Sequence, residues 1–306
     1  MITPPSLKPG DTIAIIAPAR KISAEELETA FQWFTSWGLK VKLGSHLFGS
    51  HFQYSGTDAE RASDLQQMLD DPEVMAIFAA RGGYGTLRII DELDFSGFCQ
   101  NPKWIVGFSD VTVLHSHIQV QFGIESLHAA MPFTFPLAGS ESEVMNTLWK
   151  ALSGQDLSYM VAPHALSKKG TCQGVLTGGN LSILYALSGS ISDIDTDGKV
   201  LFLEDLDEYL YHVDRMMLNL KRSGKLSNLS GLIVGGMTKM NDNAVPFGKT
   251  AEQIIAEIVA DYNFPVCFGF PAGHLDDNRA LILGRNVTLK VTGTFSTLEF
   301  GAAIAE

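Results

Sequence analysis

The chain has 306 residues, of which 45% are hydrophobic and 18% are charged, and its formal net charge is −12. This is the composition of a globular protein, long enough for one large or two medium domains with a sizeable core. A general polyanion binder needs a basic face, and the one short basic run, residues 219–225, is most simply a solvated helix end. Nucleic acid is therefore excluded as an expected partner.

Cysteine spacing and hydropathy indicate in which compartment the protein is expected. The three cysteines are widely spaced, which fits a reducing compartment and gives no zinc pattern. No signal peptide is recognisable, and no apolar run approaches the roughly 18 residues of a membrane helix. We expect a soluble cytoplasmic protein with no membrane partner.

The first half alternates between strand and helix patterns. Ser23 and Glu26 form a predicted capping box at the start of the first helix. Strands are expected at 12–18, 40–44, 74–80 and 103–108, and helices at 23–38, 56–72, 86–93 and directly after Ser109. Such alternation predicts a mainly parallel sheet with helices on both faces.

The second half has a similar pattern after a turn-rich break. Strands are expected at 199–206, 231–237, 265–274, 279–293 and 296–301, and helices at 148–154, 209–224 and 249–262. We predict two α/β domains, residues 1–155 and 174–306, joined by a linker at 156–173.

Ser109 lies at a predicted corner between a strand and a helix, in the segment Gly107-Phe108-Ser109-Asp110. Taken alone, a serine there is more often a helix N-cap than a nucleophile. The same corner is also the logic of a nucleophile elbow, although G-x-S-x-G is absent. A glycine-rich loop, Arg81–Gly85, follows another strand and reaches the same sheet edge, where ligand crevices form; it is equally well a simple turn.

A nucleophilic serine needs a base, and the base needs an orienting group. His274, in a loop after a strand, is the histidine best placed for this role, and Glu204, at the end of another strand, is the carboxylate candidate. The neighbouring acids at 205, 207 and 208 compete with Glu204, and the acidic run is equally well a helix N-terminus. No metal-binding spacing is present, so we expect no metal.

These segments, in this order, resemble the LD-carboxypeptidase family of serine peptidases. The resemblance covers nearly the whole chain and rests on TIAIIAPA (12–19), RGGYG (81–85), GFSD (107–110), TGGNL (177–181), LFLED (201–205) and GH (273–274). It implies a flavodoxin-like nucleophile domain, a C-terminal α/β domain that supplies Glu and His, and a homodimer. It also implies cleavage of the bond before the terminal D-alanine of cytoplasmic murein tetrapeptides, with no metal and no organic cofactor.

Carried over to this chain, the resemblance makes Ser109 the nucleophile, His274 the base and Glu204 its orienting group. The backbone amides of Asp110 and Gly83 would form the oxyanion hole. Arg81 is a candidate for the substrate carboxylate, with a structural ion pair as the alternative, and Asn180 and Tyr84 are further candidates for substrate binding.

Two alternatives remain open at this point. A microcin C immunity-like peptidase would use the same triad on an aminoacyl-nucleotide; the absence of tryptophan in 241–253 and 270–278 favours the murein peptide. The other alternative is a non-catalytic peptide-binding protein in which Ser109 is only a cap. The sequence does not select lysine or diaminopimelate as the third substrate residue.

Overall fold

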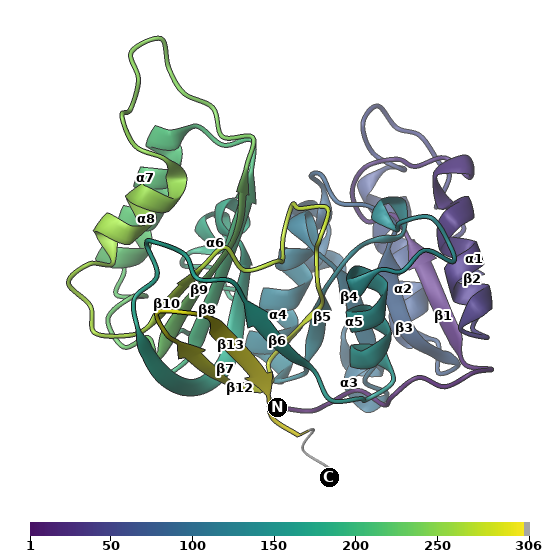
Figure 1. Cartoon of the computed structure of the whole chain (residues 1–306). Coiled ribbons are helices and arrows are strands. Elements are labelled where there is room, and N and C mark those ends of the chain that lie inside the picture. Colours follow the sequence, from purple (N-terminus) through teal and green to yellow (C-terminus); the bar gives the residue numbers. More distant parts are fainter. Residues whose placement is uncertain (303–306) are drawn as a thin grey trace.

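The computed structural model describes residues 1–302. Five strands of the first half and one strand of the second form a six-stranded sheet with helices on both faces (Figure 1). Its strands, in spatial order, are β11 (Leu281–Leu283), β5 (Ser126–His128), β4 (Trp104–Gly107), β3 (Val74–Ala79), β1 (Thr12–Ile16) and β2 (Lys40–Leu43). Strands β1 to β5 are parallel in the order 2-1-3-4-5, which is the flavodoxin-like order. The nearly continuous apolar runs of β1, β3 and β4 fit a sheet that is covered on both sides.

Helices bury both faces of this sheet. Helices α1 (Glu28–Ser36) and α5 (Glu143–Leu152) cover one face, and α2 (Asp58–Asp70), α3 (Ser96–Gln100) and α4 (Thr112–Phe122) cover the other. The predicted capping box is present before α1: the Ser23 amide donates to the Glu26 carboxylate at 2.9 Å, and the Glu26 amide donates to the Ser23 hydroxyl at 3.4 Å. The helix itself starts with a 3-10 turn, η1 (Glu25–Leu27).

The helix predicted at 86–93 is replaced by two 3-10 turns, η2 (Thr86–Arg88) and η3 (Ile90–Glu92). The amide and hydroxyl of Thr86 both donate to the buried carboxylate of Asp110, at 2.9 and 2.6 Å. This long-range contact fixes the first turn in place of a continuing helix, and local sequence does not reveal it.

The second sheet has seven strands. In spatial order they are β10 (Val266–Phe268), β9 (Gly231–Thr238), β8 (Val200–Leu206), β7 (Gly170–Asn180), β12 (Asn286–Val291), β13 (Ser296–Phe300) and β6 (Ser158–Val161). The first four are parallel and the rest antiparallel. Helices α6 (Leu181–Leu187), α7 (Leu210–Arg222) and α8 (Ala251–Ile258) pack on one face, and α7 and α8 form the outer side of the molecule in Figure 1.

The two halves share more structure than a simple linker would allow. Strand β6 and the start of β7 lie inside the predicted linker, and β11, from the C-terminal half, pairs antiparallel with β5 of the first sheet. One hydrophobic core contains residues of both sheets. Beside β11, Arg285 forms a two-pronged ion pair with the buried Glu125, at 2.7 and 2.6 Å. The single strand predicted at 279–293 is instead divided into β11 and β12, which belong to different sheets.

Candidate active site

A cavity of about 410 Å³ lies where the carboxyl ends of parallel strands from both sheets meet. The first half lines it with residues that follow β1, β3, β4 and β5, and the second half with residues that follow or end β7, β8 and β10. Ligand crevices of α/β sheets form at this edge. Ser109 and His274, which are far apart in the sequence, line this one cavity.

Ser109 occupies the sharp corner between β4 and α4. Its φ is +62°, a left-handed conformation that costs a non-glycine residue roughly 1–2 kcal/mol. It opens a 3-10 turn, η4 (Ser109–Val111), and its side chain caps neither that turn nor α4. The N-cap interpretation is therefore wrong. The strained corner instead turns the residue toward the cavity, as a nucleophile elbow does.

His274 is held by Glu204. Its Nδ1 lies 2.6 Å from Oε2 of Glu204, and its backbone amide donates to the same oxygen at 3.2 Å. Glu204 is fully buried at the end of β8. The ring packs edge-on against Phe108, with centroids 4.8 Å apart. Because Nδ1 faces the carboxylate, Nε2 is the nitrogen left for the cavity.

Electrostatics favour the charged form of this histidine. Burial on its own would lower the pKa of His274, but the hydrogen bond and charge of Glu204, with the charge of Asp205, outweigh it and raise the pKa above its ordinary value. An imidazolium that forms during a reaction is stabilised in the same way.

The loop that carries His274 is shaped by a glycine. Gly273 has a φ of +102°, and a Cβ there would lie 2.6 Å from the Cβ of Glu204, so only glycine allows this approach. Its amide donates to Asn278 at 2.8 Å, and the Thr238 hydroxyl donates to the carbonyl of His274 at 3.0 Å. The loop is thus fixed on both sides of the histidine.

The acids after Glu204 face other partners. The pairing of β8 with β9 shifts register between Leu203 and Asp205, and bulges of this kind re-aim side chains. Asp205 accepts from the side chain of Asn180 at 2.9 Å and from the amide of Ser182 at 2.9 Å. Burial, with the charge of Glu204, raises its pKa to about 7. Of the competing acids, only Glu204 contacts His274.

The glycine-rich loop lies against Ser109. A Cβ on Gly82 would lie 3.3 Å from the Ser109 hydroxyl oxygen, and Gly83 lines the cavity beside it with a φ of +115°. Asp110 is buried, and its amide belongs to the first turn of η4, where helical amides lack helical partners. The two expected oxyanion donors thus flank the cavity wall that carries Ser109.

The three expected substrate-binding residues have different surroundings. Arg81 lines the cavity, but its guanidinium contacts Glu26 at 3.2 Å and lies 4.7 Å from the ring centre of Phe133. Asn180 also lines the cavity, with its side chain bound to Asp205 and to the amide of Ile183. Tyr84 is 46% exposed, neighbours the ring of Tyr54 and does not line the cavity.

Two arginines near the cavity, Arg20 and Arg61, were not among the residues predicted for the site. Arg20, after β1, lines the cavity. Like Arg81, it lies in a loop that follows a strand, and this position in the sequence could have indicated it. Arg61 of α2 is buried and donates to the carbonyls of Pro18 and Gly85, the latter at 3.0 Å, which ties together the loops after β1 and β3.

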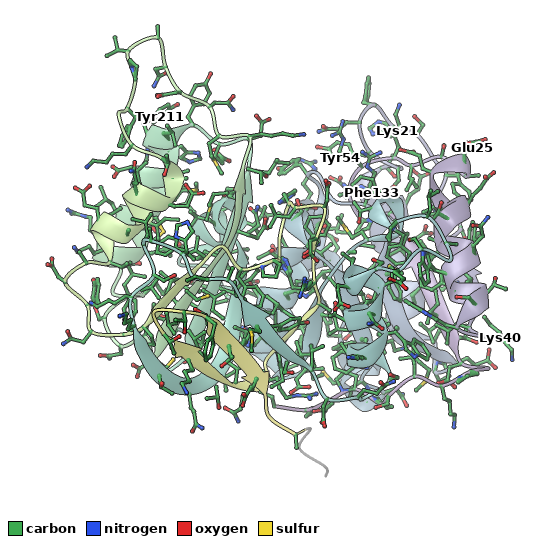
Figure 2. The ribbon with its side chains drawn as sticks, viewed as in Figure 1. Lys21, Glu25, Lys40, Tyr54, Phe133 and Tyr211 are labelled. Atoms are coloured by element: carbon green, nitrogen blue, oxygen red, sulfur yellow. The ribbon has the colours of Figure 1, made fainter. Side chains whose placement is uncertain are left out.

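Phe133, in η5 (Pro132–Thr134), lies at the upper end of the first half, across from Tyr211 of the second (Figure 2).

In the part of the chain that the structure describes, no group of three or more His, Cys, Asp or Glu side chains is arranged to hold a metal ion. Over the same residues, no helix is both long and apolar enough to cross a membrane.

Comparison with known proteins places the chain in one class of enzyme. Residues 13–129 match the LD-carboxypeptidase N-terminal domain, and residues 173–289 match the LD-carboxypeptidase C-terminal domain. The chain belongs to the LD-carboxypeptidase family, and it is a serine-type carboxypeptidase, as the sequence motifs predicted.

The similarity to individual relatives extends over nearly the whole chain. A probable murein peptide carboxypeptidase of Bacillus subtilis is 34% identical, over 98% of this chain and 95% of the relative. The crystal structure of muramoyltetrapeptide carboxypeptidase from Oxalobacter formigenes superposes with a TM-score of 0.85 at 27% identity, covering 96% of this chain and 100% of that one. The microcin C7 self-immunity protein has a TM-score of 0.86 at 20% identity, over 98% of both chains, and shares the fold.

Proposed function

We propose that this enzyme releases the terminal D-alanine of murein tetrapeptides by acyl transfer through Ser109, His274 and Glu204. The observation that carries the proposal is the shared cavity, because a serine with a strained backbone and a histidine held by a buried glutamate both line it, one from each half of the chain. The names of the Bacillus and Oxalobacter relatives support a murein peptide as substrate.

The proposed reaction has two steps. The Ser109 hydroxyl attacks the carbonyl carbon of the third residue while Nε2 of His274 takes its proton, and the amides of Gly83 and Asp110 stabilise the oxyanion. The C–N bond then breaks as His274 returns the proton to the leaving D-alanine nitrogen. Water, activated by the same histidine, hydrolyses the acyl-enzyme. Glu204 holds the ring and stabilises its charged form throughout.

The charge distribution of the cavity suits a zwitterionic peptide. Arg20 and Arg81 lie on the wall formed by the first half, and Asp205, Asp207 and Glu208 lie on the wall formed by the second. A murein tetrapeptide has a free terminal carboxylate and, at its third residue, a side-chain ammonium. The two walls are complementary to these groups.

The finer biological setting is part of the proposal. We propose a cytoplasmic, homodimeric enzyme, as the family resemblance implies. The three cysteines are free thiols, which fits a reducing compartment.

The test is incubation of the purified protein with a murein tetrapeptide, with mass spectrometry to follow loss of D-alanine. Wild type is expected to release D-alanine and Ser109→Ala to release none above background. Lysine- and diaminopimelate-containing peptides, tested separately, establish the third residue.

The alternative substrate is an aminoacyl-nucleotide, which the shared fold of the microcin C7 self-immunity protein suggests. The same assay with an aminoacyl-adenylate amide distinguishes the two: cleavage of this compound and not of the tetrapeptide would overturn the proposed substrate while keeping the nucleophile. A protein that cleaves neither compound would overturn both proposed substrates.

A further inference from the structure

Arg20 lies where the strand order of the first sheet reverses. It follows β1, and the loop Arg81–Gly85 follows its neighbour β3; the order 2-1-3-4-5 makes the gap between these two strands the switch point where ligands of such sheets bind. The Arg20 side chain is exposed to the cavity and not buried in the core.

The Arg20 side chain lies across Gly83. A Cβ on Gly83 would be 2.2 Å from Cδ and 2.4 Å from Cγ of Arg20, so the absence of a side chain at Gly83 makes room for the arginine. Gly83 adjoins Gly82, where an added Cβ would lie 3.1 Å from the Cβ of Ser109. The arginine therefore lies one residue beyond the glycine that is packed beside the proposed nucleophile.

The two arginines of this wall differ in how their charges are used. Glu26, the carbonyl of Lys21 and the ring of Phe133 contact the Arg81 guanidinium. For Arg20, the structure over residues 1–302 gives no ion pair and no side-chain hydrogen bond, so its five N–H donors are available to a ligand.

The chemistry of a carboxypeptidase requires an anion-binding group at this place. The terminal carboxylate carbon is only two bonds from the scissile nitrogen, so its partner must lie close to both the nucleophile and the oxyanion donors. A guanidinium matches a carboxylate with two parallel hydrogen bonds. Of the acidic residues that line the cavity, Asp205 lies on the opposite wall, where the side chain of Asn180 and the amide of Ser182 donate to its carboxylate.

We propose that Arg20, and not Arg81, binds the terminal carboxylate of the substrate and selects peptides with a free C-terminus. This inference rests on the proposed function, because it assigns a group of the same cavity to one end of the same substrate. Arg81 instead holds the loop after β3 through Glu26.

The test compares a tetrapeptide that ends in D-alanine with the same peptide ending in D-alaninamide. Arg20→Met is expected to lower kcat/KM for the acid by about 10- to 150-fold, the loss expected for a hydrogen bond to a charged group, and to leave kcat/KM for the amide close to that of wild type. The ratio of kcat/KM for the acid to kcat/KM for the amide should then fall by the same factor. Arg20→Lys should retain part of the ratio, and Arg81→Met should keep it, whatever its own activity.

Two results would overturn the proposal: an acid-to-amide ratio that survives Arg20→Met, or one that is lost in Arg81→Met instead. Thermal unfolding of Arg20→Met checks that the variant is folded. Calorimetric binding of both peptides to Ser109→Ala and to Arg20→Met/Ser109→Ala separates this proposal from the function. If wild type cleaves neither peptide, an Arg20-dependent preference for the acid still supports it, and equal binding of both peptides rejects it.

Discussion

The two walls of the cavity are prepared for their roles in different ways. The wall with Ser109 is prepared by backbone geometry: a left-handed serine at a strand–helix corner, with a glycine loop packed against it. The wall with His274 is prepared by buried charge, because Glu204 has no exposed surface and holds the ring by a 2.6 Å contact. A nucleophile can thus be set by local conformation, whereas its base depends on a long-range pair.

The contrast predicts that the charged wall is the more sensitive to substitution. Glu204→Gln keeps the shape but removes the charge and is expected to reduce kcat by roughly 10³- to 10⁴-fold, because the wrong tautomer of His274 is favoured. Steady-state kinetics on the tetrapeptide measure this effect. Asp64→Asn is a matched control, because Asp64 lies 2.8 Å from Nδ1 of His46 and neither residue lines the cavity. A similar loss of kcat in this variant would show that removing any histidine-bound carboxylate lowers activity.

The contact between the halves is expected to have the next largest effect, on stability. Glu125→Gln leaves Arg285 without its charged partner in a nearly buried site, which costs about 3–5 kcal/mol of unfolding free energy. Denaturant unfolding measures the loss. The double variant Glu125→Gln/Arg285→Met should recover part of it, and a single-variant cost below 1 kcal/mol would contradict the assignment.

Backbone strain at Ser109 gives a smaller effect on stability, and here the substitution by glycine is the more stable one. Ser109→Gly should be more stable than Ser109→Ala by about 1 kcal/mol, because glycine tolerates a positive φ. The same pair at Ser116, inside α4, should show the reverse order, with glycine less stable by about 1 kcal/mol. Equal stabilities at position 109 would mean that the corner is not strained.

The pH dependence should show the charged wall directly. The proposed base works when neutral, so kcat/KM should fall as the pH falls through the pKa of His274. Because that pKa is raised, the midpoint should lie above the ordinary histidine value of about 6.5. Any activity left in Glu204→Gln should have its midpoint at lower pH. A wild-type midpoint below 6 would show that another group titrates.

The smallest expected effect is that of a chelator. Sequence spacing gives no metal ligands, and residues 1–302 contain no suitable cluster. Activity on the tetrapeptide should be unchanged by EDTA. Loss that zinc restores would contradict a purely serine-based mechanism.

Sequence patterns were sufficient for features that depend on local order. Alternating strands and helices predicted the α/β class, and the strand–turn–helix segment at Ser109 predicted the corner. The family motifs also singled out Glu204 and His274, which the structure places 2.6 Å apart. What these features share is that each depends on a few consecutive residues or on a motif.

Features set by tertiary contacts could not be predicted in this way. The choice between Arg20 and Arg81 depends on which guanidinium already has a partner, and Glu26 supplies that partner from a different helix turn. The short turns at 86–92 follow from the bonds of Thr86 to Asp110. The sheet that β11 joins is likewise decided by distant strands.

The position of β11 determines how the chain could be divided into two fragments that still assemble. The loop with His274 leaves the second sheet after β10 and enters the first sheet at β11, so each half holds one end of it. Fragments cut at the apparent linker would leave the N-terminal piece without an edge strand and the C-terminal piece with an unpaired one. Co-expressed fragments should therefore reassociate through this strand, and reconstitution of the enzyme would require β11 in the second fragment.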